Sequence, residues 1–518
     1  MTAVRTLIVG STAGLLIAGG AQAADLPVRA KAVEYVRACS LYGAGFFFIP
    51  GTDTCIKLGG YVRADVTFNA GGAHGQPAWN GDPGQHNRYQ NNFVDRSRML
   101  LSVDTRTATE YGVVRTFGSV KFQFTTLNGG TFNPNSLATN LGNNANLLDT
   151  PGGGYVGVYD LFVQFAGFTF GKSVSAYASP WQGYPGGNLS SFLVGGQSGD
   201  TSGTNNIQYK VEFGNGVSTS LGLDDPTVWD RTAVYNLSLP LNATLNTGNA
   251  YAGVHAPDVV GNIRVDQAWG LFQLSAAAHQ VNASYNILTA GTAAPNNLSE
   301  ISGHPDTKWG GAVMAALQIK NLPTGVGDDI KIDASYAKGA TKYVISTDAA
   351  SPSFAMFGGT SAAGAYQSIG FGATTDAVYL PVAFGGDGSL HLTESYGFRG
   401  GFTHNWDPQW SSSIYGGYAS VRYDGAAKAF ICGNYTAGKA VSADYVCNPD
   451  YNVSQLGFVM RWTPVKNLTF STEVQWFHLD QKFAGTALLT PTAPKPTARY
   501  EFKDQDTVHL EFRAQRNF

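Results

Sequence analysis

Hydrophobic and polar residues alternate over residues 508–518, and the chain ends on an aromatic residue. The apolar face of this segment carries Val508, Leu510, Phe512, Ala514 and Phe518, and its polar face carries His509, Glu511, Arg513, Gln515 and Asn517. A period of two indicates an extended strand whose two faces meet different surroundings. About ten residues is also the length at which a tilted strand crosses a bilayer. One such strand equally fits a soluble sandwich, so the interpretation depends on how often the pattern recurs.

The alternation recurs in about sixteen segments, an even number as in single-chain bacterial barrels. These segments span 57–68, 96–104, 114–124, 159–165, 168–172, 206–213, 217–224, 259–266, 272–279, 313–320, 330–336, 396–406, 410–420, 456–462, 468–476 and 508–518. Short turns between them alternate with long stretches rich in Gly, Asn, Ser and Thr, at 70–92, 126–153, 174–204, 225–257, 282–306, 341–390, 424–450 and 480–500. This asymmetry predicts an all-β fold, a transmembrane antiparallel β-barrel with short periplasmic turns and long extracellular loops.

The start of the chain predicts export. Arg5 precedes an apolar run at 7–18, and Ala21-Gln22-Ala23 follows it, which is typical of a signal peptide cleaved after Ala23. The run is shorter than the roughly 20 apolar residues of a spanning helix. We therefore expect a signal peptide at 1–23, an N-terminal periplasmic-side segment at 24–55 and the barrel at 56–518.

Composition agrees with a barrel in the bacterial outer membrane. Charged residues make up 13% of the chain, and glycine accounts for 64 of 518 residues, whereas soluble domains average about 25% charged residues and about 7% glycine. The net charge is -3, and removal of Arg5 leaves 32 basic against 36 acidic residues, or -4. No polybasic segment indicates nucleic-acid binding, and no motif implies a cofactor.

Several runs resemble the porin family of alphaproteobacterial outer membranes. They are Ala24 to Val28, Cys39 to Phe46, Ile49 to Arg63, Thr105 to Gly112, Gln164 to Lys172 and Val265 to Gly270. The resemblance implies a passive diffusion channel of sixteen strands, assembled as a homotrimer in outer-membrane lipid and open to small hydrophilic solutes and ions. It also implies that the third long loop, starting near Ser173, folds into the lumen and narrows it. The sixth long loop is longer than the family pattern leads us to expect.

Charged residues on the polar faces of the first strands suggest a basic wall inside the barrel. Sixteen strands enclose a water-filled channel, so inward charges need not be buried. We expect Arg63, Arg98 and Arg115 near mid-height, with Lys121 above and Arg96 nearby. The remaining candidates are Asp160 and Lys172 on the next strands and, in the third loop, Tyr177, Trp181 and Asp200 facing the wall across a constriction. Charged rings set ion preference in pores, and we predict a weak preference for anions; solvated arginines without a special role are the alternative.

The four cysteines pair by proximity as Cys39 with Cys55 and Cys432 with Cys447. In an exported protein, an even number of cysteines without C-x-x-C spacing favours disulfides over a metal site. Each bond would close a loop of about 15 residues and stabilise the fold by roughly 3 kcal/mol. Free buried thiols are the alternative. The terminal Phe518 is interpreted as a C-terminal assembly signal.

Three other functions compete with an open pore. A barrel hydrolase would need a nucleophile beside a histidine and a carboxylate; no such spacing accompanies His279 or His509, so we expect no enzyme. A substrate-specific uptake channel would carry a track of lumen aromatics or a plug domain, and the segment 24–55 is too short for a plug. A non-conducting adhesive or structural barrel would be silent in planar bilayers, whereas a diffusion channel would give steady conductance.

Overall fold

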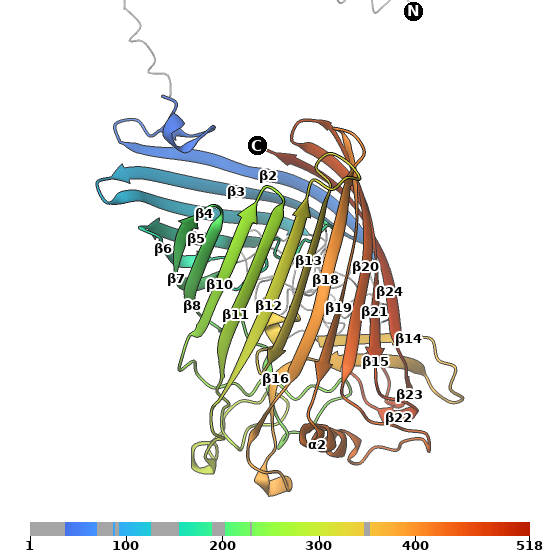
Figure 1. Ribbon diagram of the computed structural model, residues 1–518. Helices are drawn as coiled ribbons and strands as arrows, with labels where there is room; N and C mark the ends of the chain where they lie inside the picture. The colour runs from blue at the N-terminus through green and yellow to red at the C-terminus, as the bar shows by residue number, and fades with distance from the viewer. Residues whose placement is uncertain are drawn as a thin grey trace, which may run out of the picture.

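A computed structural model of the chain describes residues 37–69, 86–88, 93–125, 155–188, 203–227, 230–346 and 353–518 (Figure 1). Sixteen strands form one closed antiparallel barrel, and β1 (Phe47–Phe48) adds to β2 to make a 17-stranded sheet. The barrel strands are β2 (Thr54–Phe68), β3 (Phe93–Thr109), β4 (Gly112–Thr125), β5 (Tyr155–Phe165), β6 (Phe168–Ser173), β7 (Thr204–Gly214), β8 (Val217–Asp224), β10 (Asp258–Gln267), β11 (Gly270–Val281), β12 (Lys308–Lys320), β13 (Asp329–Lys338), β18 (Glu394–Asn405), β19 (Trp410–Arg422), β20 (Tyr451–Val465), β21 (Leu468–Gln481) and β24 (Gln505–Asn517). The predicted barrel and its strand number are confirmed.

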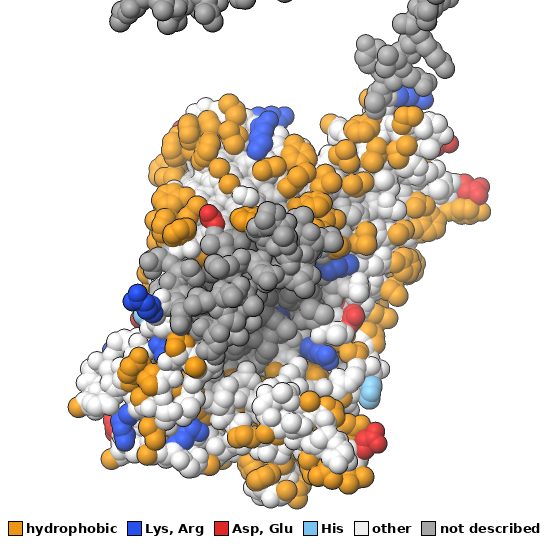
Figure 2. Space-filling view, turned by 180° about the vertical axis from the view of Figure 1, so that it is seen from behind, with side chains coloured by type: hydrophobic (Ala, Val, Ile, Leu, Met, Phe, Trp, Pro, Cys, Tyr) orange, Lys and Arg blue, Asp and Glu red, His pale blue; other side chains and the backbone are white. Residues whose placement is uncertain are grey.

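The barrel closes between its first and last strands. β2 pairs with β24 from Tyr61 opposite Asn517 to Phe68 opposite Leu510. Along β24 the two faces separate as the alternation predicts, because Phe512 is 47% exposed on the outside whereas Glu511 is fully buried. Hydrophobic side chains accordingly cover much of the outer surface in Figure 2.

Short turns lie at one end of the barrel and long connections at the other (Figure 1). The turn between β7 and β8 shows why glycine is needed. Gly216 has a φ of +73°, and a Cβ on it would lie 1.9 Å from the carbonyl oxygen of Asp266. Asn215, with a φ of 49°, supplies the other left-handed residue of the predicted Asn-Gly turn.

The long connections contain secondary structure that the sequence analysis did not predict. One small sheet has the order β17-β16-β9, and another has the order β14-β15-β23-β22. Their strands are β9 (Ala233–Asn236), β14 (Ser353–Gly358), β15 (Gln367–Ala373), β16 (Thr375–Tyr379), β17 (Leu390–Leu392), β22 (Thr486–Leu489) and β23 (Ala498–Phe502), and helix α2 (Gly425–Thr436) lies beside them. We call these seven strands and α2 the outer cap. These segments form part of the connections that the sequence analysis described only as long and rich in Gly, Asn, Ser and Thr.

An aromatic core explains why the outer cap folds. Phe371 of β15 lies 5.8 Å from Phe502 of β23 and 5.9 Å from Tyr435 of α2, between ring centroids. The Asp424 side chain caps α2 by accepting a hydrogen bond from the Ala427 N–H (2.8 Å), a favourable way to begin a helix. Among the described residues no helix is long and apolar enough to cross a membrane.

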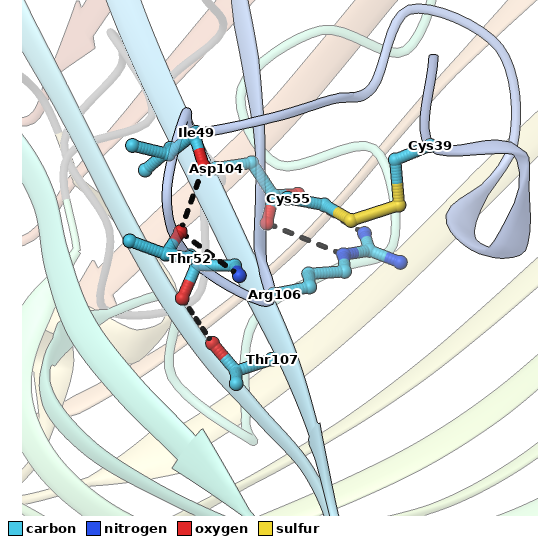
Figure 3. Close-up of a disulfide and its surroundings, with 8 residues drawn as sticks. Cys39, Ile49, Thr52, Cys55, Asp104, Arg106 and Thr107 are labelled. Atoms are coloured by element: carbon cyan, nitrogen blue, oxygen red, sulfur yellow. Dashed lines mark hydrogen bonds and ion pairs between the residues drawn. A yellow bond between two sulfur atoms is a disulfide. The ribbon is translucent and has the colours of Figure 1, made fainter. Parts of the chain in front are cut away.

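Both predicted disulfides are present. Cys39 is bonded to Cys55 at the start of β2, and Cys432 of α2 is bonded to Cys447. Figure 3 shows the first bond beside Arg106 of β3. The predicted signal peptide, its cleavage site at Ala23 and residues 24–36 lie outside the described residues, so the proposed boundaries at 23 and 55 stay predictions.

Candidate pore constriction

The connection after β6, here called loop 3, turns into the barrel. Its described part, 174–188, begins after Ser173 at the end of β6. Its main-chain carbonyls accept hydrogen bonds from Asn262 of β10, from Gln273 of β11 (2.8 Å) and, at its far end, from Arg513 of β24 (3.2 Å). All three side chains face the lumen. Loop 3 therefore runs along the inner wall from β10 round to β24, as the resemblance implied.

Asp333 of β13 holds the middle of loop 3. Its carboxylate accepts hydrogen bonds from Trp181 Nε1 (2.6 Å) and Ser179 Oγ (3.0 Å). Arg399 of β18 forms a buried ion pair with Asp333 (2.9 Å) and also donates to the carbonyl of Gln182. One carboxylate and one guanidinium thus join two strands of the wall to three residues of the loop.

Asn188 fixes the far end of the described loop. Its N–H donates to Glu473 (2.7 Å) and its side chain donates to Ser471 (2.6 Å), both on β21. Arg461 of β20 donates to the Asn188 side chain (3.3 Å) and to the carbonyl of Gly186. These bonds bring loop 3 to the edge of β24, next to the predicted basic wall on β2 and β3.

The three loop residues predicted to face the basic wall have different outcomes. Tyr177 is fully buried and packs edge-on against Tyr343 at 4.6 Å, so the prediction that its ring lines the passage is wrong. Trp181 points its indole N–H at Asp333, on the wall behind the loop. Asp200 lies outside the described residues.

Arg63 and Arg98 form the centre of the basic wall. They are register partners on β2 and β3, and both side chains are on the inner face. Arg63 Nε donates to Gln515 (2.8 Å), and Arg98 Nε donates to Gln123 (2.6 Å). Because glutamine is uncharged, Gln515 leaves the positive charge of Arg63 in place.

Acidic residues interrupt this wall on one side. Arg96 forms an ion pair with Asp65 (2.7 Å). Arg513 forms one with Glu511 (2.6 Å) and approaches Asp65 at 3.4 Å. The inner surface across β24, β2 and β3 therefore mixes charges of both signs, whereas the sequence analysis expected a positive surface.

The prediction that Arg115 lies level with Arg63 and Arg98 is wrong. Arg115 pairs in register with Arg106, near the turn that joins β3 and β4. It forms an ion pair with Asp104 (3.0 Å) and donates to Gln164 (2.8 Å). The displacement follows from the antiparallel register, because Arg98 is eight positions from Arg106 along β3, about 26 Å at 3.3 Å per residue.

The remaining predicted residues surround the base of loop 3. Lys121 Nζ lies 4.4 Å from the centroid of the Tyr159 ring. Asp160 accepts a hydrogen bond from Ser119 (3.0 Å). Lys172 Nζ donates to the carbonyls of Tyr159 (2.7 Å) and Gly203 (2.6 Å), so it ties the two ends of loop 3 together.

The residues that hold loop 3 against the wall could not be identified from the sequence. They are Asp333, Arg399, Arg461, Glu473 and Arg513. Each lies on the polar face of an alternating segment. An isolated charged residue on that face was a local signal for a side chain that faces the lumen. Their pairing joins strands up to several hundred residues from loop 3, which no local pattern reveals.

Comparison with known proteins gives a consistent assignment. Residues 25–510 match the family model described as the porin subfamily. Porin Omp2b of Brucella abortus (strain 2308) is 30% identical over 269 residues, and Porin Omp2b of Brucella melitensis matches to the same extent. The match covers 52% of this chain and 63% of the relative, less than two thirds of its length.

A solved structure supports the fold alone. The outer membrane channel DcaP of Acinetobacter baumannii superposes with a TM-score of 0.55 at 14% sequence identity. The superposition covers 91% of this chain and 99% of that chain. The barrel fold is therefore shared with a known outer-membrane channel.

Proposed function

Because this chain belongs to the porin subfamily, we propose that it forms a water-filled channel for passive diffusion of small hydrophilic solutes and ions. Family membership and the closed barrel place it in the bacterial outer membrane and favour a channel over an enzyme. A barrel of sixteen strands is wide enough to leave an aqueous bore, unlike one of eight.

The observation that carries the proposal is the position of loop 3. Loop 3 lies against the strands from β10 round to β24 and is held there by several side-chain hydrogen bonds. On the opposite side, Arg63, Arg96, Arg98 and Lys121 face inward from β2 to β4. The passage then runs between the loop and this mixed, largely basic surface. Charges at a narrow point set ion preference, and we infer a weak preference for anions.

Conductance of the purified full-length protein in planar bilayers tests the channel. Steady, large, ohmic conductance supports diffusion. Current that saturates or is blocked by one solute class supports a substrate-specific uptake channel instead. Silence of a correctly folded barrel, verified by its heat-sensitive migration in detergent, supports an adhesive or structural role.

The short strand β6 supports assembly of several copies. Its six residues extend about 20 Å. Because the strand is tilted, it spans less than the roughly 25 Å apolar band of outer-membrane barrels. A second copy covering this side would shield the low wall from lipid, and three copies match the family expectation. Native mass measurement in mild detergent should find three chains; a monomer alone would contradict this arrangement.

A further inference from the structure

Both ring nitrogens of His391, on β17 of the outer cap, face carboxylates. Nδ1 lies 2.6 Å from an oxygen of Asp424, and Nε2 lies 3.0 Å from an oxygen of Asp387. The His391 side chain is 16% exposed, whereas those of Asp387 and Asp424 are about half exposed. The imidazole therefore lies between two acids from different segments, at a place where the ring can exchange its proton with solvent.

These two contacts fit only the charged form of the ring. An ionised carboxylate can only accept hydrogen bonds, and a neutral imidazole can donate only one. Although burial raises it, hydrogen bonds from Ser389 and His391 hold the pKa of Asp387 below its usual value. Burial acts on Asp424 in the same way, and bonds from the Ala427 N–H and His391 lower its pKa too. Both acids are therefore ionised at neutral pH, and only the imidazolium donates to both.

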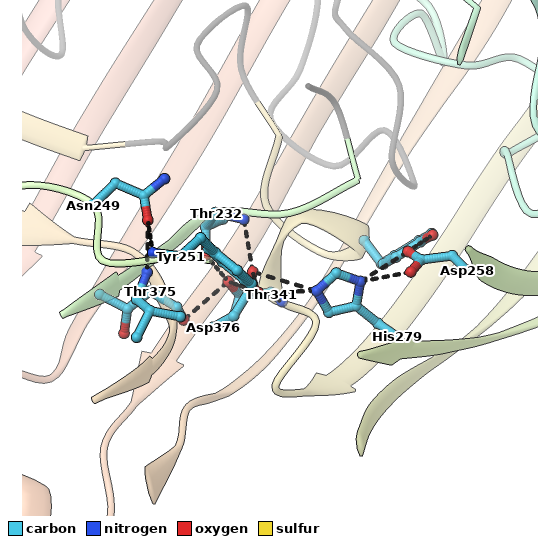
Figure 4. Close-up of polar contacts among 10 residues, drawn as sticks. Thr232, Asn249, Tyr251, Asp258, His279, Thr341, Thr375 and Asp376 are labelled. Carbon is cyan, nitrogen blue, oxygen red and sulfur yellow. Dashed lines mark hydrogen bonds and ion pairs between the residues drawn. The ribbon is translucent and has the colours of Figure 1, made fainter. Parts of the chain in front are cut away.

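The buried His279 of β11 shows a contrasting arrangement. Its Nδ1 lies 2.7 Å from an oxygen of Asp258. Its Nε2 meets the Tyr251 hydroxyl at 2.9 Å, and this hydroxyl bonds to Asp376 in turn (Figure 4). A hydroxyl can donate or accept, so the site of His279 tolerates a neutral ring. At His391 no hydroxyl stands between the second nitrogen and its carboxylate.

We propose that His391 is a proton-operated clasp, which holds the turn before β17 against the start of α2 when the ring is charged and releases the turn when the ring is neutral. Asp424 is the fixed partner, because its side chain also caps α2 through the Ala427 N–H (2.8 Å). Asp387 is the partner that moves. It follows η4 (Val382–Phe384) in a turn with glycines at 385, 386 and 388, and glycine leaves the backbone free to rearrange.

Charged groups on the neighbouring elements do not replace the imidazolium, because they are neutral or already bonded. Burial raises the pKa of Tyr379 on β16, so its phenol stays neutral. The bonded groups are Lys338 of β13 with Glu394 of β18 (2.9 Å), Lys428 of α2 with Asp450, and Arg422 of β19 with the Asn452 side chain (2.6 Å). The clasp therefore opens as the pH rises through the range in which histidine loses its charge, about 5 to 8.

Hydrogen exchange of the folded, full-length protein in detergent tests the clasp. Protection factors, corrected for the intrinsic exchange rate at each pH, should fall about two- to fivefold in residues 384–392 between about pH 5.5 and about pH 9, as expected for loss of one exposed ion pair. β15, in the aromatic core of the cap, should keep its protection. Equal protection of 384–392 at both pH values overturns the proposal, whether or not the variants below fold.

Two variants separate the proton from the contact itself. In Asp387→Asn the amide donates to a neutral ring or accepts from a charged one, so residues 384–392 should stay protected at both pH values. In His391→Gln, which does not titrate, protection should be low at both. His304→Gln, at an exposed histidine in another outer connection, should keep the full response. An unchanged pH response in Asp387→Asn or His391→Gln, or its loss in His304→Gln, contradicts the clasp.

Discussion

The barrel wall and the outer cap use similar residues in opposite ways. In the wall, apolar side chains face outward, and charged side chains such as Arg63 and Asp333 face the lumen or anchor loop 3. In the cap, aromatic side chains such as Phe371 and Tyr435 turn inward and form an apolar core. The wall thus separates lipid from water, whereas the cap excludes water from its own interior.

This difference separates the residues that control permeation from the residues that stabilise the outer end of the barrel. Arg399 and Asp333 act on loop 3, which occupies the lumen, so changes there should alter both conductance and barrel stability. The disulfide between Cys432 and Cys447 acts on α2, so its loss should affect the cap alone. Variants in the two regions therefore test whether they are independent.

Asp333→Ala should have the largest effect. It leaves the buried Arg399 without its carboxylate and frees Trp181 and Ser179, and breaking a buried ion pair costs about 3–5 kcal/mol. We expect a lower unfolding temperature and higher single-channel conductance as loop 3 loosens. Asp329→Asn, on the same strand but paired with Lys331 (3.1 Å), is the control. Unchanged conductance in Asp333→Ala would show that loop 3 does not narrow the passage.

The wall was predictable from the sequence because its two faces meet different media. Each strand, such as β24, carries the signal locally, through a period of two. The register was not predictable to the same degree, so Arg115 was placed level with Arg98 when it lies near a turn. The charge of the wall was also misjudged, because Asp65 pairs with Arg96 on the neighbouring strand and Glu511 pairs with Arg513 two residues along β24.

The cap was not predictable because its core is assembled from distant segments. Phe371, Tyr435 and Phe502 come from three different connections, so no single segment shows a complete pattern. The helix start at Asp424, followed by an alanine-rich run, was a local signal that went unused. In the candidate site, Arg399 and Arg461 could be placed on the polar face, but their bonds to loop 3 depend on the path of that loop.

Loss of the disulfide between Cys432 of α2 and Cys447 should have the second-largest effect. Replacing Cys432 and Cys447 by serine opens a loop of sequence separation 15, for which the chain-entropy model gives about 3 kcal/mol. Hydrogen exchange should rise in α2, while conductance stays unchanged. Replacing Cys39 and Cys55, separated by 16 residues, is a matched control that should leave α2 protected. Faster exchange in α2 in both variants would show that cap and wall are coupled.

Arg63→Gln should change selectivity with little change in stability. Arg63 forms no ion pair among the described residues, so its removal subtracts a charge without exposing an acid. A unit charge about 8 Å from an ion in water contributes roughly 0.5 kcal/mol, or about twofold in anion-to-cation permeability. Reversal potentials in a salt gradient measure it. Arg516→Gln, on the exposed end of β24, should leave the permeability ratio unchanged. An equal shift in both variants would show that Arg63 does not lie at the constriction.

The smallest expected effect is a pH dependence confined to the cap. Lys495 lies 4.3 Å from the centroid of the Phe357 ring, and burial lowers its pKa to about 8. Unfolded lysine titrates near 10.4, so between these values the unfolded chain binds more protons and stability rises with pH. Lys495 is buried, and its ammonium keeps hydrogen bonds to Gln367 and to the carbonyl of His86, so we expect the gain to stay below about 1 kcal/mol.

Lys495→Met keeps the contact with Phe357 but removes the titrating group. The protease resistance of the cap should therefore rise between pH 8 and 10 in the unmodified protein relative to Lys495→Met, with protease activity calibrated at each pH on an unfolded substrate. Lys503→Met, an exposed lysine after β23, should behave like the unmodified protein. If Lys495→Met retains the full pH response, the dependence arises elsewhere. If conductance follows the same response, the cap is not independent of the channel.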